Sequence, residues 1–233
     1  MKKILVFSFC VLALSLTASG QRKKVDPSKP TAQEQKIVAE IRQRYADIKN
    51  MIRLMGEGPE WMNSDGDEDS PGGWPPDYFH VKIVQNLPAT GYHEENVRIY
   101  YEEEEIPEEI YPPLRMAFAS SKYNFAARQY YEEYLYDKKG NLIFIFAQEP
   151  DLDTGMWRQM RLYMQGTKVV HTIVRECPLT DDLEVRDLSQ DPASEVYSGS
   201  GLPTGYIESV DTYVQKAKKI EKMFKAIDEG RTL

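Results

Sequence analysis

The hydrophobic pattern of this chain changes its period twice, and this change constrains the fold more than any other feature of the sequence. Near each end of the chain, apolar residues recur at steps of three and four, as they do on one face of an α-helix. The N-terminal set is Ile37, Ile41, Tyr45, Ile48, Ile52 and Met55, and the C-terminal set is Ile207, Val210, Val214, Ala217, Phe224 and Ile227. Each predicted helix must bury its apolar face against another part of the protein.

Local signals mark the ends of both predicted helices. Thr31 and Glu34 have the spacing of a capping box, in which a hydroxyl and a carboxylate bind the free backbone N–H groups of the first turn. Gly56 and Gly230 follow the last apolar positions, where glycine commonly ends a helix. The sequence therefore predicts one amphipathic helix near each end of the chain.

Between these helices, apolar and polar residues alternate with a period of two, and Tyr, Phe, Ile and Val become frequent. Both features are typical of β-strands. The expected strands are about His80 to Asn86, Asn96 to Glu102, Phe125 to Tyr136, Leu142 to Gln148, Trp157 to Met164 and Lys168 to Arg175. The segment from Tyr123 to Tyr136 also fits a helical stripe, but its tyrosine content and the turn that follows favour a strand.

Together these patterns predict an α+β fold in one domain that spans residues 31 to 233. We expect a twisted antiparallel sheet of five or six strands, with the N- and C-terminal amphipathic helices packed on it. The segment from Cys177 to Pro203 is interpreted as a long loop, because it combines acidic residues with Pro, Ser and Gly. Long loops of this kind are often functional or mobile.

The first twenty residues have the parts of a signal peptide. A short basic start precedes an apolar run from Ile4 to Leu16, and small residues end the segment at residue 20. The next residue is Gln21 rather than the cysteine that a lipoprotein requires, and residues 21 to 30 form a charged, flexible lead-in. We therefore expect a periplasmic or secreted protein without a lipid anchor. No later apolar run is long enough for membrane insertion after signal removal.

The charge of the chain excludes some classes of partner. The sequence has 29 basic and 37 acidic residues and a net charge of −8. Loss of the leader removes two lysines and no acidic residue, so the net charge becomes about −10. An acidic protein repels phosphate backbones and anionic lipid, which argues against nucleic acid or a membrane surface as partner. Cys177 is the single cysteine outside the leader, so no intrachain disulfide is expected.

No stretch of the mature sequence matches a catalytic, metal-binding or cofactor-binding motif. The run from Asn63 to Asp69 alternates oxygen ligands but lacks the glycine and glutamate positions of an EF-hand loop, so it is interpreted as a solvated loop. Three histidines are too few and too scattered for a zinc site built on them. A nucleophile turn of the G-x-S-x-G type is also lacking. We therefore expect neither a metal nor a cofactor.

The last predicted hairpin allows side chains to be assigned to faces of the sheet. A two-residue turn at Gln165-Gly166 would pair Met160 with His171. That register places His171 on the same face as the methionine and leucine side chains of its partner strand. We therefore predict that His171 is a core residue rather than a catalytic base.

The opposite face of this hairpin is the one candidate binding surface in the sequence. It carries Trp157, Arg161 and Tyr163, a combination of aromatic and hydrogen-bonding groups that occurs in protein interfaces and on sugar-binding platforms. A sheet face that lies beneath a long loop or a helix has a similar composition. We predict a ligand or partner at these three residues and keep the structural interpretation as the alternative.

Two segments resemble a known group of sequences. Residues Ala39 to Ala46 and Lys122 to Gln148 look like parts of uncharacterised exported proteins of Bacteroides-type bacteria. The resemblance covers the first helix and the sheet region, and it implies a Gram-negative envelope or secreted setting. It brings no known activity.

Two hypotheses of function follow from the sequence. The first is an exported, non-enzymatic interaction or binding protein whose partner is a protein or a carbohydrate. The alternative is a hydrolase of the glycosidase type, whose carboxylates come from different strands and converge only in the folded protein. The two hypotheses predict different sites. A hydrolase needs a cleft with two carboxylates roughly 5 to 10 Å apart, whereas a binding protein needs an aromatic or apolar recognition surface.

Overall fold

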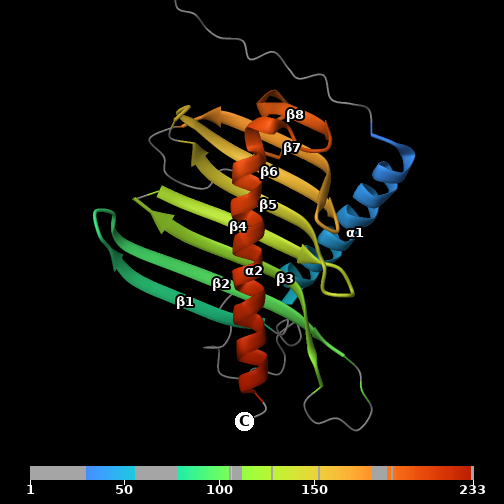
Figure 1. The fold of residues 1–233 in the computed structure, drawn as a ribbon, viewed down its shortest axis with the longest axis vertical. Helices are drawn as coiled ribbons and strands as arrows, with labels where there is room; N and C mark the ends of the chain where they lie inside the picture. Colours follow the sequence, from blue (N-terminus) through green and yellow to red (C-terminus); the bar gives the residue numbers. More distant parts are fainter. Residues whose placement is uncertain are drawn as a thin grey trace, which may run out of the picture.

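The computed structural model describes most of the chain that follows the predicted leader (Figure 1). The described residues are 30–55, 78–104, 106, 112–126, 128–151, 153–179, 188–189 and 191–231. The predicted signal peptide, the lead-in up to residue 29 and the acidic run from Asn63 to Asp69 lie outside these residues. Parts of the long segment from Cys177 to Pro203 also lie outside them.

Two helices flank a sheet of eight strands. Helix α1 spans Ala32–Met55 and helix α2 spans Ile207–Gly230. The strands are β1 (Tyr78–Leu87), β2 (Gly91–Glu103), β3 (Leu114–Phe125), β4 (Arg128–Tyr136), β5 (Leu142–Asp151), β6 (Met156–Gln165), β7 (Lys168–Pro178) and β8 (Glu195–Ser200). Each strand pairs antiparallel with its neighbour in sequence, so the strand order is β1 to β8. This arrangement confirms the predicted α+β class.

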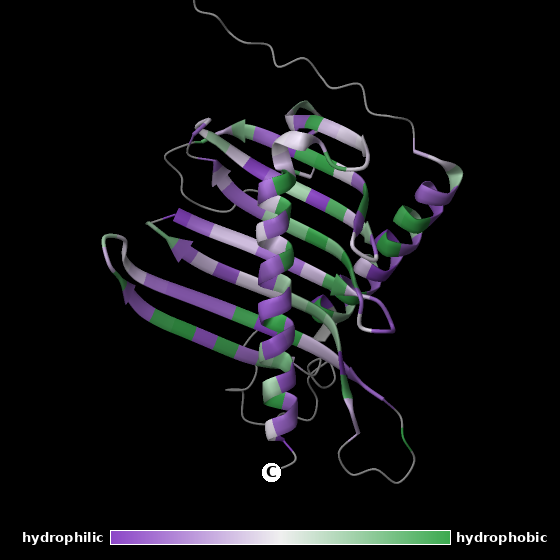
Figure 2. Cartoon of the chain, viewed as in Figure 1, coloured by the Kyte–Doolittle hydropathy of each residue, from purple (hydrophilic) through white to green (hydrophobic). Residues whose placement is uncertain are grey.

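The sheet carries a helix on each face. Figure 1 shows α2 in front of the sheet, across its strands, and α1 behind it near one side. Because successive side chains of a strand point to opposite faces, apolar residues at both parities supply two separate cores. In Figure 2 the strands and both helices show this mixture of apolar and polar positions.

The two cores differ in the strand residues that they use. The core beneath α2 contains Val97, Ile99, Ala119, Tyr134, Ile145, Met160, Leu162 and Val174 from the sheet, and Val210, Tyr213, Ala217, Ile220 and Phe224 from the helix. The core beneath α1 contains Tyr100, Phe118, Leu135, Phe144, Phe146, Tyr163, Val170 and Ile173 from the sheet, and Val38, Ile41, Ile48 and Ile52 from the helix. Most of each predicted amphipathic stripe is therefore buried against the sheet, whereas Ile207 at the start of α2 is exposed.

The predicted capping box is present at the start of α1. The Thr31 hydroxyl accepts a hydrogen bond from the backbone N–H of Glu34 at 3.2 Å, and the Glu34 carboxylate accepts one from the backbone N–H of Thr31 at 2.7 Å. The same carboxylate accepts a hydrogen bond from the Ser200 hydroxyl at the end of β8, at 3.2 Å. The cap therefore also joins the beginning of α1 to the edge strand of the sheet.

The predicted count of five or six strands was too low, because β3 and β8 were not recognised. Strand β3 contains two alanines and two serines, which weaken the strand signal, and the sequence pattern predicted no element between Pro113 and Lys122. The expected strand from Phe125 to Tyr136 is in fact the end of β3, a tight turn and β4. Ala126 has a φ of 48° in that turn. A positive φ is uncommon for alanine, so the residue type did not indicate a turn at this position.

The predicted register of the β6–β7 hairpin was also wrong. The turn is closed by Gln165 and Lys168, so it lies one residue later than expected, and an irregularity follows between Tyr163 and Met164. His171 consequently pairs with Tyr163 instead of Met160. The shift moves His171 to the face beneath α1, because a slip of one residue reverses the direction of a strand side chain. The prediction that His171 is buried is confirmed, since it is 8% exposed.

We predict that the two helices stabilise one cooperative fold. Ile48→Ala in α1 and Ile220→Ala in α2 should each lower the free energy of unfolding by about 2–5 kcal/mol, because each removes a buried aliphatic side chain and leaves a cavity. Urea unfolding followed by circular dichroism measures this. Glu40→Ala, at an exposed position of α1, is the control and should change stability by less than about 0.5 kcal/mol. An unchanged unfolding midpoint for Ile48→Ala would show that α1 is not part of the cooperative unit.

Candidate functional site

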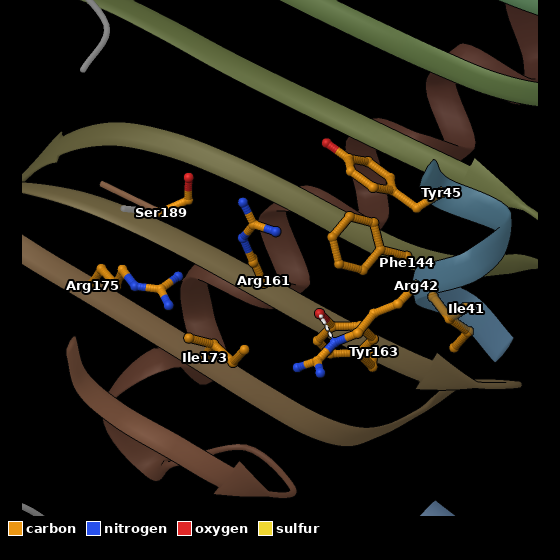
Figure 3. A pocket seen from close by; sticks show the side chains of 9 residues that line it. All are labelled: Ile41, Arg42, Tyr45, Phe144, Arg161, Tyr163, Ile173, Arg175 and Ser189. Atoms are coloured by element: carbon orange, nitrogen blue, oxygen red, sulfur yellow. Dashed lines mark hydrogen bonds between the residues drawn. The ribbon is translucent and has the colours of Figure 1, made fainter. Parts of the chain in front are cut away.

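A hollow of about 440 Å³ lies between α1 and the sheet at strands β5, β6 and β7 (Figure 3). It is lined by Ile41, Arg42, Tyr45, Phe144, Arg161, Tyr163, Ile173, Arg175 and Ser189. We call this hollow the arginine pocket, because, among the lining residues that the structure describes, three are arginines and none is acidic. Its volume falls within the usual range of small-molecule sites.

Arg161 projects from β6 into the middle of the arginine pocket, between Arg42 and Arg175 (Figure 3). Its guanidinium carbon lies 5.2 Å from the centroid of the Phe146 ring, and its Nε is buried without a hydrogen-bond partner. Within the described part of the chain, Arg161 forms no ion pair. A partly buried guanidinium without a carboxylate is unusual, because a charge inside a protein is normally paired.

The other two arginines of the pocket are each held by one contact. Arg42 comes from α1 and donates a hydrogen bond from Nε to the Tyr163 hydroxyl at 3.1 Å. Arg175 comes from β7 and lies 3.3 Å from a carboxylate oxygen of Glu195 on β8, while its Nε is buried without a partner. Both contacts fix the guanidinium groups in position and use only part of their donor capacity, since each guanidinium has five N–H donors.

A buried carboxylate fixes the aromatic wall of the arginine pocket. Glu133 is 2% exposed and accepts hydrogen bonds from the hydroxyls of Tyr45 and Tyr131 and from the Lys49 ammonium, the last at 2.8 Å. Burial, together with the neighbouring Glu133 charge, raises the pKa of Tyr45 well above its ordinary value. Glu133 is therefore satisfied by its own donors and does not neutralise the arginines.

A second hollow of about 570 Å³ adjoins the arginine pocket along α1. It is lined by Pro30, Gln35, Val38, Ala39, Arg42, Gln43, His171 and Ser198. We call it the polar hollow, because neutral hydrogen-bonding side chains dominate its polar lining. Arg42 lines both hollows, so they adjoin at this side chain.

On the side of the sheet, His171 of the polar hollow contacts Tyr163 of the arginine pocket. Its ring centroid lies 5.5 Å from that of Tyr163. Burial lowers the pKa of His171, and the nearby Arg42 guanidinium lowers it further. The imidazole is therefore neutral at pH 7, because its pKa lies below the ordinary value near 6.5.

The opposite face of the sheet contains the complementary charge. The Lys216 ammonium of α2 lies 3.1 Å from a carboxylate oxygen of Glu95 and 3.0 Å from one of Glu132, and it stands 3.5 Å from the centroid of the Tyr123 ring. Glu132 is buried and also accepts hydrogen bonds from the hydroxyls of Tyr123 and Tyr134. Lys216 and Glu132 therefore have their partners within this group, and the contacts attach α2 to the sheet.

Arg158 forms a second closed group beneath α2. Its guanidinium pairs with Glu176 at 3.1 Å, with Glu149 at 3.6 Å and with Asp151. Burial raises the pKa of Glu149, and the nearby charges of Glu132 and Asp151 raise it further. In contrast to Arg161, Arg158 is therefore a structural arginine.

Two larger hollows differ from the arginine pocket in their charges. One of about 860 Å³ lies between α2 and the first strands and contains Glu95, Asp211 and Lys216. The other, of about 1000 Å³, lies between α1 and the hairpin turns and contains Arg44 and Glu102, which form an ion pair at 3.5 Å. Both hollows are lined by charges of both signs. The arginine pocket differs from both, because the charged residues in its described lining are all arginines.

The three residues that the sequence predicted as a binding surface do not all line the arginine pocket. Trp157, Arg161 and Tyr163 do share one face of β6, as strand alternation predicted. Trp157 is 6% exposed and Tyr163 is 2% exposed beneath α1, so they do not form an open surface. Arg161 and Tyr163 line the arginine pocket, whereas Trp157 does not.

Sequence reasoning missed Arg42, Arg175 and His171 as members of the site. Arg42 lies in an amphipathic helix where a charged residue beside the apolar stripe is ordinary, and its distance in sequence from β6 gives no signal of contact. Arg175 follows the same strand parity as Ile173 on the face beneath α1, so a correct hairpin register would have placed it beside Arg161. The turn position was therefore the missing information.

The described residues give no support to a metal centre or to a pair of catalytic carboxylates in the arginine pocket. No group of three or more His, Cys, Asp or Glu side chains is placed to hold a metal ion in this part of the chain. The buried carboxylates Glu132, Glu133 and Glu176 all have cationic partners. Cys177, the single cysteine outside the predicted leader, is partly buried at the end of β7.

Comparisons of the chain with protein-family models, with curated proteins and with solved structures found no match. In the part of the chain that the structure describes, neither long helix has an apolar stretch sufficient to cross a membrane. Function is therefore inferred from the residues of the site and from their geometry.

The two kinds of arginine should respond differently to substitution. Arg158→Met should lower the free energy of unfolding by about 3–5 kcal/mol, because it leaves buried carboxylates without their cation. Arg161→Met retains the apolar stem but removes a charge that its two arginine neighbours repel. It should change stability by less than about 0.5 kcal/mol, or raise it. Urea unfolding at pH 7 measures both values. Equal losses in the two variants would show that Arg161 is also structural.

Proposed function

We propose that this protein is an exported, non-enzymatic binding protein whose ligand is an anion held in the arginine pocket. One observation carries the proposal: three guanidinium groups line one hollow, and none of its described lining side chains is acidic, in a chain of net charge −8. Such a concentration of one charge is costly without a bound anion, because like charges at close range raise the energy of the folded state. An anion of the ligand supplies the missing partner.

The donor chemistry favours a carboxylate or a phosphate. A guanidinium presents its N–H groups in a rigid fork that matches two oxygens of such an anion. Arg42 and Arg175 are held in place by Tyr163 and Glu195, so the site is organised before the ligand binds. Organisation before binding increases affinity, since little side-chain freedom is lost in the complex.

The hydrolase alternative has less support. A glycosidase needs two carboxyl groups that flank the bond to be cleaved. The lining residues of the arginine pocket include none, and the buried glutamates on both faces are engaged by lysine, arginine or tyrosine. The arrangement therefore favours binding over catalysis.

The sequence supports an exported setting for this activity. The predicted signal peptide and the resemblance to exported proteins of Bacteroides-type bacteria both point to the periplasm or the cell exterior. A binding protein there would meet small anions or acidic carbohydrates released outside the cytoplasm. The negative charge of the whole chain would keep it from binding polyanions indiscriminately, so recognition depends on the pocket.

Calorimetric titration tests the proposal. We expect the protein that begins at Gln21 to bind glucuronate or glucose 6-phosphate, and to bind glucose at least about tenfold more weakly, a difference of about 1.4 kcal/mol. Arg161→Met should weaken anion binding at least about tenfold, because it removes the unpaired guanidinium. Arg53→Met, the same change of charge at an exposed position of α1 outside the pocket, is the matched control and should bind like the unaltered protein. Equal losses in the two variants, or equal binding of glucose, would contradict the proposal.

A further inference from the structure

The arginine pocket and the polar hollow adjoin at Arg42, and this adjacency bears on the shape of the ligand. Arg42 lines both hollows, and Tyr163 of the first lies against His171 of the second, with ring centroids 5.5 Å apart. A ligand that fills only the arginine pocket would leave the polar hollow beside it unused. The two adjoining hollows therefore have room for a ligand of two connected parts.

The two hollows differ sharply in chemistry. The arginine pocket presents cations, whereas the polar hollow presents two amides, a hydroxyl and an imidazole, from Gln35, Gln43, Ser198 and His171. All four groups are neutral at pH 7, since the pKa of His171 is lowered by burial and by Arg42. Neutral donors and acceptors of this kind bind hydroxyl groups rather than charged groups.

His171 contributes an imidazole ring to the polar hollow. The residue is 8% exposed, and the backbone of Gly199 engages its ring. A neutral imidazole has one donor and one acceptor nitrogen, so it suits a ligand hydroxyl better than a second anion.

We infer that the ligand is an acidic sugar with at least two units: a uronic acid whose carboxylate lies against Arg161 and Arg175, followed by a neutral sugar whose hydroxyls lie in the polar hollow. The inference rests on the proposed anion-binding function and specifies the chemical class of the anion. A uronate combines one carboxylate with several hydroxyls, and a linked neutral sugar continues the hydroxyls without further charge. This order of groups matches the order of the two hollows.

Other anions match the two hollows less well. An acyl chain attached to an anionic group could contact Val38 and Ala39. However, it would offer no hydrogen bond to Ser198 or to the imidazole of His171. A compound with an anion at each end would meet Arg42 as the one cation in the described lining of the polar hollow, and this cation is shared with the arginine pocket. A neutral, hydroxyl-rich second part avoids both costs.

The test compares a uronic acid with the same acid linked to a neutral sugar. Calorimetric titrations would use glucuronate, an aldobiouronic acid made of glucuronate and xylose, and xylobiose as the neutral disaccharide. We expect the aldobiouronic acid to bind at least about tenfold more tightly than glucuronate, and xylobiose to bind more weakly than either. A tenfold ratio corresponds to about 1.4 kcal/mol, the scale of one or two hydrogen bonds.

Variants of the polar hollow locate the second unit. Ser198→Val should remove most of the advantage of the disaccharide and leave the dissociation constant of glucuronate within about twofold. His171→Phe should also reduce the ratio of the two affinities. Gln33→Leu, an exposed glutamine of α1 that does not line either hollow, is the control. Thermal melting checks folding. If His171→Phe fails to fold, Ser198→Val alone decides the result.

The outcomes separate this inference from the proposed function. Equal affinities for glucuronate and the aldobiouronic acid would overturn the inference and leave anion binding intact. The inference would also fail if glucose 6-phosphate or a sulfated disaccharide bound at least about tenfold more tightly than the aldobiouronic acid, because the anion would then not be a uronate. Lack of binding by any of these anions would overturn the proposed function itself.

Discussion

The fold depends on one constraint: both faces of the sheet are apolar, so each face requires a helix of its own. Residues at alternate positions of the same strands, such as Leu162 and Tyr163 in β6, belong to opposite cores. An antiparallel sheet usually has one solvated face and one buried face. Here α2 buries one face and α1 buries part of the other. The two helices at the ends of the chain thus hold a sheet whose strands otherwise contact only their neighbours in sequence.

The same arrangement separates opposite charges across the sheet. Beneath α2, the cations Lys216 and Arg158 are surrounded by carboxylates and complete their ion pairs. Beneath α1, Arg161 reaches a hollow whose other charged lining residues, among those described, are Arg42 and Arg175. Stability explains the first group, since removal of its cations leaves buried carboxylates unpaired. Stability does not explain the second group, because arginines that lie close together repel one another. Local arrangements that oppose stability are characteristic of functional sites.

Much of the fold follows from local sequence signals, and much of the site does not. The two helices, the capping box of α1 and six of the strands are marked by hydrophobic period, composition and turn residues. Strand β3 was missed because its alanines and serines are weak strand formers, and the β6–β7 register was missed because one residue of slip gives almost the same pattern. Arg161 and Tyr163 could be placed on one face from alternation alone. Arg42 required the tertiary contact between α1 and β6, which the sequence pattern does not contain.

The central claim is that the arginine pocket binds an anion, and a crystal structure with selenate bound tests it most directly. Selenium scatters anomalously, so its position is found independently of the protein model. The account predicts an anomalous peak within about 4 Å of the Arg161 guanidinium, at hydrogen-bonding range of the selenate oxygens. The peak should disappear in Arg161→Met and persist in Arg53→Met. A pocket without a peak, while selenate occupies other sites on the protein, would contradict the account.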